Sequence, residues 1–451
     1  MIITRFIRDK RNLIQLQGLV VFLFSSIVLQ AQEKYTLKSI LETGLERNLE
    51  IKITYNNQQI SNNNLTIGNA GFLPTVDFNF GYSGSINNVK QFPADGSATI
   101  STNGINNSGL DAGVYLNWKV FDGFSIKTNY ARLKELQQKG ELNSRLTIEN
   151  FVSDLTGEYY NFVQQNIRYN NLKSTLKLSK ERLRIVEARY EIGSLSRLDL
   201  QQAKVDFNSD SSKLIRQQEV LFTSRIKINQ LMALDNIEKL LVPADTVIRF
   251  NTLLSKETVF DKMMKLNSFI LLAEKEKNLS VLDLKSVQSK NYPYLKLNAG
   301  YGFSQNKYEV ATYQQQNNMG TNYGITLGYN LFDGFNRIRQ QKNAKIQLEN
   351  NNIEYEQLKL SLKSDFSNIW MAYKNNMELT KLEQENLSNA KENYQIAIDR
   401  YKLGDLSGIE LREAQNSLLE AEDRLVQAQY NTKLCEISLM QISGQVTEYL
   451  K

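Results

Sequence analysis

The stretch RYEIGSLS at residues 189–196 recurs 211 residues later as RYKLGDLS at residues 400–407. A second motif repeats with the same offset, because the sequence FDGF occupies both residues 121–124 and residues 332–335. Motifs that repeat in one order at constant spacing predict an internal duplication. The period is far too long for a solenoid repeat, so we interpret the two copies as equivalent halves of one ring or barrel.

A third pair of landmarks indicates where the two copies differ in length. Asn48 lies 26 residues before Pro74, and Asn267 lies 26 residues before Pro293, so this pair is offset by 219. The difference between 219 and 211, eight residues, must fall between the proline and the FDGF motif. The first copy carries a polar stretch around residues 90–108, and we expect a longer loop there.

The composition argues against several classes of protein. The chain has 451 residues and no histidine, which removes the commonest general base and metal ligand. Its single cysteine, Cys435, allows no disulfide within the chain. Only four prolines are present, as suits long uninterrupted helices. We therefore expect no enzyme activity, no catalytic residues, and no metal or other cofactor.

The N-terminus has the pattern of a secretory signal peptide. Basic residues precede an apolar run at residues 18–29, and Ala31 then precedes a polar segment, so we predict a leader at residues 1–31. The alternative, a membrane anchor, needs roughly 20 apolar residues, more than this run provides. No cysteine lies there to carry a lipid. Without the leader, four Lys or Arg and one Asp are lost and the formal charge falls from +6 to +3, which does not indicate nucleic-acid binding.

Four segments alternate strictly between apolar and polar residues, as strands do when one face is apolar. The first is typical, with Val76, Phe78, Phe80 and Tyr82 on one side and polar or small residues on the other. The predicted strands occupy about residues 74–85, 109–121, 293–304 and 322–332.

Strands of about ten residues with this alternation suit a membrane β-barrel with a polar lumen. A soluble antiparallel sheet with one buried face has the same period and is the alternative. No window of 18 apolar residues follows the leader, so we expect any membrane insertion to use strands. Four strands are too few to close a barrel, for which about eight are needed, so several chains would share one.

The rest of the chain predicts long helices. Each FDGF motif is followed by about 67 residues without proline, or roughly 100 Å of helix at 1.5 Å per residue, then by a turn at the repeated glycine and a shorter returning helix. We predict helical hairpins at residues 124–234 and 335–442, packed as coiled coils. Another helix is expected before each strand pair.

These elements define the predicted organisation of the chain. A first repeat at residues 32–234 and a second at residues 259–442 each contain a helix, two strands and a helical hairpin. The segment at residues 235–258 is predicted to be an equatorial connector, and residues 443–451 a C-terminal tail.

The order of these elements and the repeated Tyr-x-x-Gly motifs resemble those of TolC-like outer-membrane efflux proteins over nearly all of the mature chain. The resemblance implies an α+β membrane protein that forms a homotrimer, with a 12-stranded β-barrel, four strands per protomer, in the lipid of the outer membrane. It further implies a long coiled-coil barrel of helices in the periplasm. The expected partners are a periplasmic adaptor, or membrane fusion protein, and a proton-driven or ATP-driven inner-membrane transporter.

The resemblance also assigns the hairpin turns. Members of the family contact the adaptor through residues at the hairpin tips, and the resemblance matches these to six positions of this sequence. They are Gly193, Leu195, Ser196, Gly404, Leu406 and Ser407. Glycine accepts the backbone angles of the turn and leaves backbone groups exposed. The alternative is that these residues only form the turn between two helices.

Four further positions match the periplasmic gate of the family: Glu413, Glu410, Tyr401 and Asp199. Carboxylates repeated around a narrow axis would repel anions and attract cations. Asp199 and Glu410 also fit capping boxes, Ser-x-x-Asp and Ser-x-x-Glu, so starting a helix is an alternative role for both. Glu413 has no such role and is the first gate candidate, with a solvated helix face as its alternative.

The predicted function is passive conduction through the exit duct of a tripartite efflux or type I secretion system. The alternative is a periplasmic or surface coiled-coil scaffold without a pore. The sequence does not identify the exported substrate, the adaptor or the pump.

Overall fold

The computed structural model describes residues 34–310 and 313–450, so the predicted signal peptide lies outside the described residues. The chain divides into two compact units, which are described separately. Unit 1 comprises residues up to 53, 146–267 and from 361 onward, and unit 2 comprises residues 54–145 and 268–360. Each sequence repeat contributes to both units.

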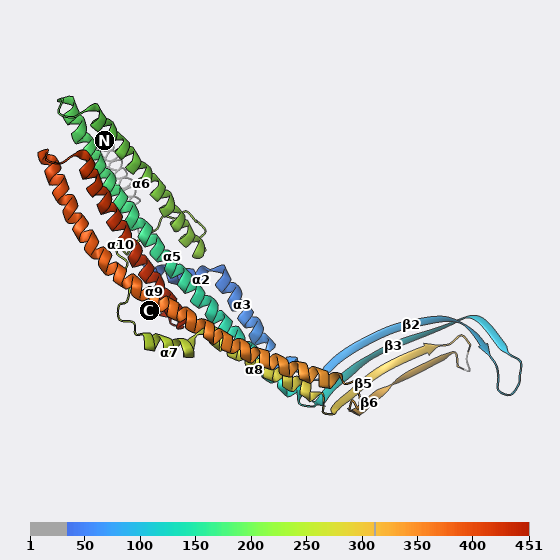
Figure 1. Cartoon of the computed structure of the whole chain (residues 1–451). Helices are drawn as coiled ribbons and strands as arrows, with labels where there is room; N and C mark the ends of the chain where they lie inside the picture. Colours follow the sequence, from blue (N-terminus) through green and yellow to red (C-terminus); the bar gives the residue numbers. More distant parts are fainter. Residues whose placement is uncertain (1–33, 311–312, 451) are drawn as a thin grey trace, which may run out of the picture. The chain divides into compact units, whose positions relative to one another are not determined.

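Helices and strands occur in the same order in the two halves of the chain. The elements are β1 (Lys34–Tyr35), α2 (Leu37–Arg47), α3 (Leu49–Asn64), α4 (Ile67–Ala70), β2 (Thr75–Gln91), β3 (Ile100–Asp122), α5 (Ser125–Glu191), α6 (Arg197–Leu231), β4 (Val242–Pro243), α7 (Lys256–Leu266), α8 (Ser268–Ser289), β5 (Tyr294–Lys307), β6 (Gln315–Gly328), α9 (Asn336–Leu403), α10 (Gly408–Ile442) and the short 3₁₀ helix η1 (Val446–Leu450). In each half, helices are followed by a strand pair and then by a helical hairpin, and the first half has the additional short helix α4 (Figure 1).

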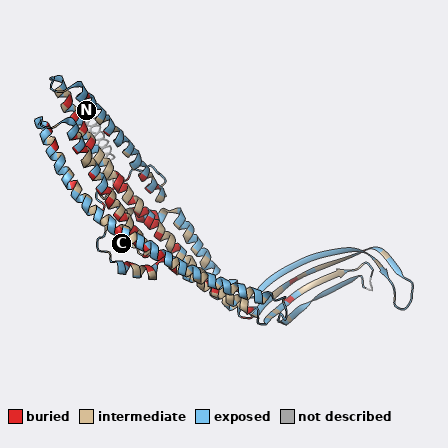
Figure 2. Ribbon diagram, viewed as in Figure 1, coloured by how far each residue is buried: buried red, intermediate tan, exposed pale blue. Residues whose placement is uncertain are grey.

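The core of unit 1 forms where α5 packs against the segments at the start and end of the chain. Leu155 and Tyr159 of α5 are completely buried, as is Ile228 of α6 (Figure 2). The Tyr159 hydroxyl donates a hydrogen bond to Asp245 at 2.7 Å, so its polar atom is satisfied inside the core.

The predicted connector and tail also belong to this core. Ile248 from the connector and Val446 from the tail are buried with Tyr159. β4 in the connector pairs in parallel with β1. The last predicted connector residues, 256–258, instead begin α7, because the Ser255 side chain accepts a hydrogen bond from the Thr258 backbone and caps the helix.

The two asparagines that marked the sequence repeat make equivalent contacts in unit 1. The Asn48 side-chain amide donates to the carbonyl of Leu231 at 3.0 Å, and the Asn267 amide donates to the carbonyl of Ile442 at 2.8 Å. Leu231 and Ile442 are the last residues of α6 and α10. Each asparagine therefore satisfies a free carbonyl at the end of a returning helix.

The strands of unit 2 form one antiparallel sheet in the order β2-β3-β5-β6. Its register brings apolar residues together on one face, where Val76, Leu116, Ala299 and Tyr323 lie in adjacent positions across the four strands. The other face is polar or small, with Asp77, Tyr115, Gly300 and Asn322 in the corresponding row.

The strand bounds differ from those predicted. β2 and β3 run further than residues 74–85 and 109–121, and pair as far as Gln91 with Ile100. The loop between them is therefore residues 92–99, and most of the polar stretch 90–108 that we expected as a loop is strand. Ladder pairing uses backbone groups, so it continues through polar residues that carry no apolar pattern.

The last strand also differs from its predicted bounds. β6 occupies residues 315–328 and not 322–332, since its polar N-terminal residues pair with the end of β5, where Lys307 lies opposite Gln315. Residues 329–331 lead instead into the second FDGF motif, which begins at Phe332.

The FDGF motifs turn each strand pair into the following long helix. Gly123 and Phe124 have φ of 70° and 72°, and Gly334 and Phe335 have φ of 66° and 64°. A side chain at Gly123 would collide with the Ser289 carbonyl, 2.2 Å from the Cβ position, so glycine is required there.

The aspartate of the motif starts the helix. Asp122 accepts a hydrogen bond from the Ile126 backbone at 3.0 Å, and Asp333 accepts one from the Arg337 backbone at 2.9 Å. Each aspartate satisfies an N–H group that has no partner within the helix. No helix in the described residues is both long and apolar enough to cross a membrane.

Candidate functional site: the hairpin tips

The turn of each helical hairpin is built by the repeated RYxxGxLS sequence. At the end of α5, the Gly193 N–H bonds to the Tyr190 carbonyl at 2.9 Å and the Ser194 N–H bonds to the Arg189 carbonyl at 2.8 Å. At the end of α9, Gly404 and Asp405 make the same pair of bonds to Tyr401 and Arg400, at 3.1 and 3.0 Å. These are the two bonds of a Schellman motif.

The motif requires glycine at both tips. Gly193 has φ of 76° and Gly404 has φ of 85°, which is the left-handed region that other residues avoid. A Cβ atom at either position would meet no other described atom within 4 Å. The requirement therefore comes from the backbone angle and not from crowding within the chain.

A capping box begins each returning helix. Ser196 and Asp199 bond reciprocally, side chain to backbone, at 3.2 and 3.0 Å, and Ser407 and Glu410 do so at 3.3 and 2.9 Å. Hydrogen bonds from the Ser196 side chain and backbone lower the pKa of Asp199, and those from Ser407 lower the pKa of Glu410. Both carboxylates thus serve as helix caps in a single chain.

Glu413 and Tyr401, the other gate candidates, have opposite environments. Glu413 is exposed on α10, and within the described residues its carboxylate has no hydrogen bond or ion pair. Tyr401 is 4% exposed and packs with Ala397, Leu411 and Ala414. Burial raises the pKa of the Tyr401 phenol. The structure therefore brings Tyr401 into the tip core and leaves Glu413 in solvent.

Arg189 joins the two tips within one chain. Its guanidinium lies 5.3 Å from the centre of the Tyr401 ring and donates to the carbonyls of Tyr401 and Lys402 at 3.4 and 3.2 Å. A cation at the carbonyl end of α9 interacts favourably with the helix dipole. The equal spacing of the two repeated motifs does not predict this contact. A sequence offset shows that two residues are equivalent, but not that they lie close together in the fold.

Each tip also presents large apolar side chains that were not among the predicted adaptor-contact residues. Ile192 and Leu198 are 80% and 77% exposed, and their counterparts 211 residues later, Leu403 and Ile409, are 85% and 76% exposed. Their repetition on either side of the glycine turn was the signal that could have identified them. Exposed apolar groups of this kind mark an interaction surface.

A buried ion pair connects the two hairpins of unit 1 behind the tips. Arg412 of α10 binds both carboxylate oxygens of Asp210 of α6, at 2.6 and 2.7 Å, and Asp210 is 1% exposed. Ser179 of α5 also donates to Asp210. Burial opposes ionisation, but the hydrogen bonds from Arg412 and Ser179 outweigh it and lower the pKa of Asp210.

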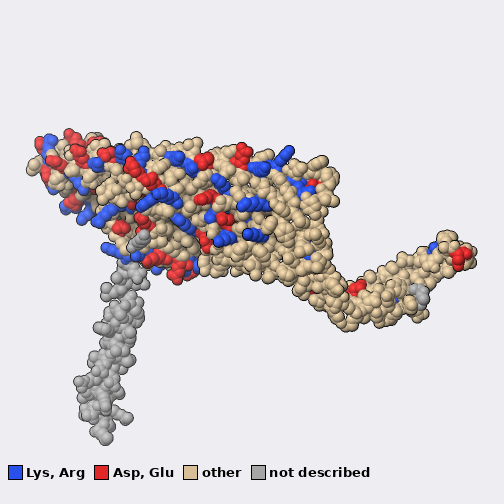
Figure 3. Space-filling model, turned by 90° about the horizontal axis from the view of Figure 1, so that it is seen from below, with Lys and Arg blue, Asp and Glu red and all other residues tan. Residues whose placement is uncertain are grey.

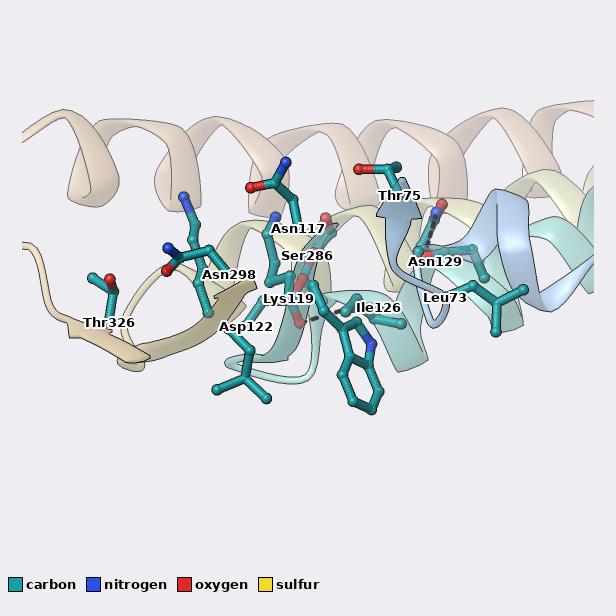
Figure 4. A pocket seen from close by; sticks show the side chains of 16 residues that line it. Leu73, Thr75, Asn117, Lys119, Asp122, Ile126, Asn129, Ser286, Asn298 and Thr326 are labelled. Atoms are coloured by element: carbon teal, nitrogen blue, oxygen red, sulfur yellow. Dashed lines mark hydrogen bonds between the residues drawn. The ribbon is translucent and has the colours of Figure 1, made fainter. Parts of the chain in front are cut away.

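The polar face of the sheet in unit 2 continues toward its helices. A recess of about 780 Å³ is lined by Asn117, Lys119 and Asn298 of the strands and by Asn129 of α5 and Ser286 of α8 (Figure 4). Lys119 lies directly opposite Lys296 on adjacent strands. The lining combines polar side chains and these two lysines with apolar residues such as Leu73 and Ile126. Among the described residues, no group of three acidic or cysteine side chains is placed to hold a metal ion.

Charged groups are distributed unevenly between the elements. In Figure 3, lysine, arginine, aspartate and glutamate side chains cover the helical surface, whereas the strands show few of them on the same face. Exposed apolar residues such as Phe78 on β2 and Tyr323 on β6, which are 71% and 87% exposed, occupy the sheet instead.

Comparison with known proteins identifies this combination of sheet and hairpins. The sequence profile of the outer membrane efflux proteins matches residues 40–234 and 270–445, which is most of the chain. The chain belongs to the outer membrane efflux protein family. The resemblance to TolC-like proteins is thereby confirmed, and with it a location in the outer membrane.

Individual members of the outer membrane efflux protein family are distant in sequence. The outer membrane efflux protein BepC of Brucella suis biovar 1 is 20% identical over 418 residues, which cover 93% of this chain and 87% of BepC. The outer-membrane channel OprN matches with a TM-score of 0.75 and 18% identity, over 91% of this chain and 90% of OprN.

The outer membrane channel CmeC of Campylobacter jejuni gives a similar result. Its TM-score is 0.74 at 16% identity, over 91% of this chain and 85% of CmeC. These solved channels share the fold of this chain, with its mixture of helices and strands.

Proposed function

We propose that the protein is one subunit of a homotrimeric exit duct that passively conducts substrate across the outer membrane. In this proposal three chains contribute four strands each to a 12-stranded β-barrel, and their hairpins form a helical barrel in the periplasm. The observation that carries it is the open four-stranded sheet, which is apolar on one face and polar on the other.

Both edges of the sheet are long and unpaired within the described chain. β2 has 17 residues and β6 has 14, and neither has a second neighbour. A strand edge without partners is intolerable in lipid, because each free backbone group there costs several kcal/mol. Pairing of β6 with β2 of another copy satisfies both edges and places the apolar face toward lipid.

The helices offer a second argument for association. In unit 2, α9 exposes an apolar stripe with spacings of seven or eight residues, and α3 exposes apolar residues of its own. The stripe consists of Ile338, Ile346, Ile353 and Leu360, each between 53% and 70% exposed, and the residues of α3 include Tyr55 and Ile60 at 58% and 56%. Heptad spacing of apolar residues is the pattern by which helices pack in coiled coils.

The internal duplication is part of the proposal and is supported by the sheet register. In the first strand pair Val76 lies opposite Leu116, and in the second Leu295 lies opposite Leu327. The offsets are 219 for the first member and 211 for the second, as the sequence landmarks require. This shared register supports the proposed equivalence of the two strand pairs.

The hairpin tips are proposed to dock a periplasmic adaptor, which couples the duct to an inner-membrane transporter for efflux or for type I secretion. The contact would involve the tip residues Gly193, Leu195, Ser196, Gly404, Leu406 and Ser407. The exposed apolar pairs beside the glycines, Ile192 with Leu198 and Leu403 with Ile409, support this role.

A substitution at the tip separates docking from folding. Gly404→Lys places a charge and side chain on the docking surface, so we expect loss of export with trimers intact. Gly404→Asn is the matched control, because asparagine tolerates the left-handed conformation and adds no charge. Disappearance of the trimers in Gly404→Lys would favour a purely structural glycine.

The gate is proposed to involve Glu413 first, with Glu410, Tyr401 and Asp199 around it. The exposure of Glu413 and its lack of a partner in the described residues leave its charge available near the tips. Three copies of that carboxylate around the symmetry axis would attract cations and repel anions.

The competing proposal, a coiled-coil scaffold without a pore, makes different predictions for one experiment. Protein purified from outer membranes with detergent and added to planar lipid bilayers should give discrete conductance steps. It should also migrate as a trimer before boiling and as a monomer after. Release from membranes without detergent, as a monomer that produces no conductance, would support the scaffold instead.

A further inference from the structure

Arg400 lies at the position equivalent to Arg189 but makes no equivalent contact with the residues that the structure describes. Its guanidinium is held within its own tip, at 3.2 Å from the Asp405 carbonyl and 3.5 Å from the Asp405 carboxylate. The Arg400 side chain is 52% exposed and that of Asp405 is 72% exposed. Long contacts between exposed groups are readily exchanged for others.

Tyr401, whose ring Arg189 covers, has an exposed counterpart in the first hairpin. Tyr401, beneath Arg189, is 4% exposed, whereas Tyr190, its equivalent on the first hairpin, is 38% exposed. The same asymmetry holds one helical turn away. Ile185 of α5 packs against the Tyr401 cluster, and its equivalent Ile396 on α9 is 53% exposed.

One chain thus contains one complete contact between its two tips. It also contains the two surfaces of a second, equivalent contact, but these two surfaces do not touch each other. The complete contact joins Ile185 and Arg189 to Tyr401. The unmatched halves are Ile396 and Arg400 on the second hairpin, and Tyr190 on the first. Two complementary surfaces on different parts of one chain form a heterologous interface, which closes into a ring when the copies are related by rotation.

Charge favours the second contact. In the first, Arg189 bonds to the carbonyl of Lys402, so a second cation is nearby. The residue equivalent to Lys402 is Glu191, 211 positions earlier, whose carboxylate would attract an arginine. The carbonyls of Tyr190 and Glu191 at the end of α5 offer the same helix C-terminus as those that Arg189 binds on α9.

We infer that Arg400 of one copy binds the C-terminus of α5 in the next copy, over Tyr190 and beside Glu191, and so closes the ring of tips. This inference rests on the proposed trimer. It identifies the partner as a second copy of this chain and names the residues that each copy supplies. In forming the contact, Arg400 leaves Asp405.

Chemical cross-linking tests the contact directly. In a Cys435→Ser background, the pair Arg400→Cys and Glu191→Cys is treated in membranes with a short bifunctional thiol reagent. Covalent dimers and trimers that survive boiling in SDS are expected. The matched control is Arg189→Cys with Lys402→Cys, whose link lies within one chain and must leave the boiled protein at the monomer position.

The failure of this inference is distinguishable from failure of the trimer. Unboiled trimers without any covalent ladder from Arg400→Cys and Glu191→Cys would overturn the contact and leave the trimer standing. Wild-type protein that never forms trimers would overturn both.

Charge reversal gives a second readout that does not depend on the reagent. Arg400→Glu should lower the temperature at which the trimer dissociates in SDS, and Arg400→Glu with Glu191→Arg should restore it, since the pair is then reversed. Asp405→Asn should leave the temperature unchanged. Failure of the double variant to recover, or a loss in Asp405→Asn equal to that in Arg400→Glu, would contradict the contact.

Discussion

At the scale of single residues, some charged groups near the tips are buried in ion pairs, whereas others are exposed to solvent. Asp210 is buried and paired with the partly buried Arg412, while Glu413, the next residue of α10, is exposed. The paired groups fix α10 against α6. In the proposed gate, the exposed Glu413 carboxylate is the group that would interact with ions.

The buried pair should be the more sensitive to substitution. Arg412→Ala leaves the Asp210 carboxylate buried without its bidentate partner, a change that costs about 3–5 kcal/mol. We expect the variant trimer to dissociate in SDS at a clearly lower temperature. Arg424→Ala is the control, because the Arg424 side chain is 50% exposed and its pair with Glu383 contributes about 0–1 kcal/mol.

The effect of Arg412→Ala should depend on pH. The pKa of Asp210 is lowered in the folded protein, so its pairing stabilises the fold above the unfolded pKa of about 3.9 and is lost as the pH falls through the folded value. The stability difference between wild type and Arg412→Ala should be largest near neutrality and should shrink in strong acid. An undiminished difference there would show that lost packing, not charge, accounts for it.

Glu413→Ala tests the free carboxylate. Its removal should raise single-channel conductance in planar bilayers and weaken block by divalent cations, because a ring of negative charge is lost. Glu410→Gln is a useful comparison, since it removes a charge that already serves as a helix cap. Conductance and block equal to wild type in Glu413→Ala would remove it from the gate.

At the scale of helices and strands, the contact between the two halves of one chain predicts the contact between chains. Leu116 of β3 lies opposite Ala299 of β5. Adding 211 to the first and subtracting 219 from the second gives Leu327 of β6 and Phe80 of β2. We therefore expect these two residues to lie opposite each other across the subunit boundary.

A disulfide or thiol cross-link checks this register. In Cys435→Ser protein, Leu327→Cys with Phe80→Cys should yield covalent oligomers in membranes. Leu327→Cys with Asn79→Cys should not, because a shift of one residue moves the side chain to the other face of the sheet. The reverse preference would require a different register, and with it a different equivalence of the strands.

The same scale shows what the sequence could and could not predict. Alternation in Val76–Tyr82 and the glycine of each tip follow from local rules, and both occur as expected in the structure. The polar ends of β2 and β3 carry no pattern, so their pairing was missed. The Arg412–Asp210 pair was missed because its members lie 202 residues apart and only the packing of α10 on α6 brings them together.

The functional residues were predicted less completely than the fold. Resemblance to the family gives the adaptor-contact and gate residues as predictions, and the capping boxes show that two of them, Asp199 and Glu410, have a local role in the helix. Ile192 and Leu403 directly precede the repeated glycines, but their exposure was not predicted. No local rule distinguishes an exposed apolar residue from a buried one.

At the scale of the whole molecule, a single chain exposes several surfaces that a neighbouring copy could cover. Within the described residues, the sheet has two unpaired edges, α9 exposes a heptad stripe, and Arg400 does not contact Tyr190. A head-to-tail ring of copies resolves all three in one operation. In the proposed duct the polar face of the sheet lines the lumen, and passive conduction would require no chemistry by the chain itself.

The number of chains in the ring is the quantity on which the account depends most. Native mass spectrometry of the protein extracted from outer membranes in mild detergent measures it directly. The account predicts one species with the mass of three chains, which gives 12 strands at four per chain. A species with the mass of a single chain, stable without partners, would contradict it.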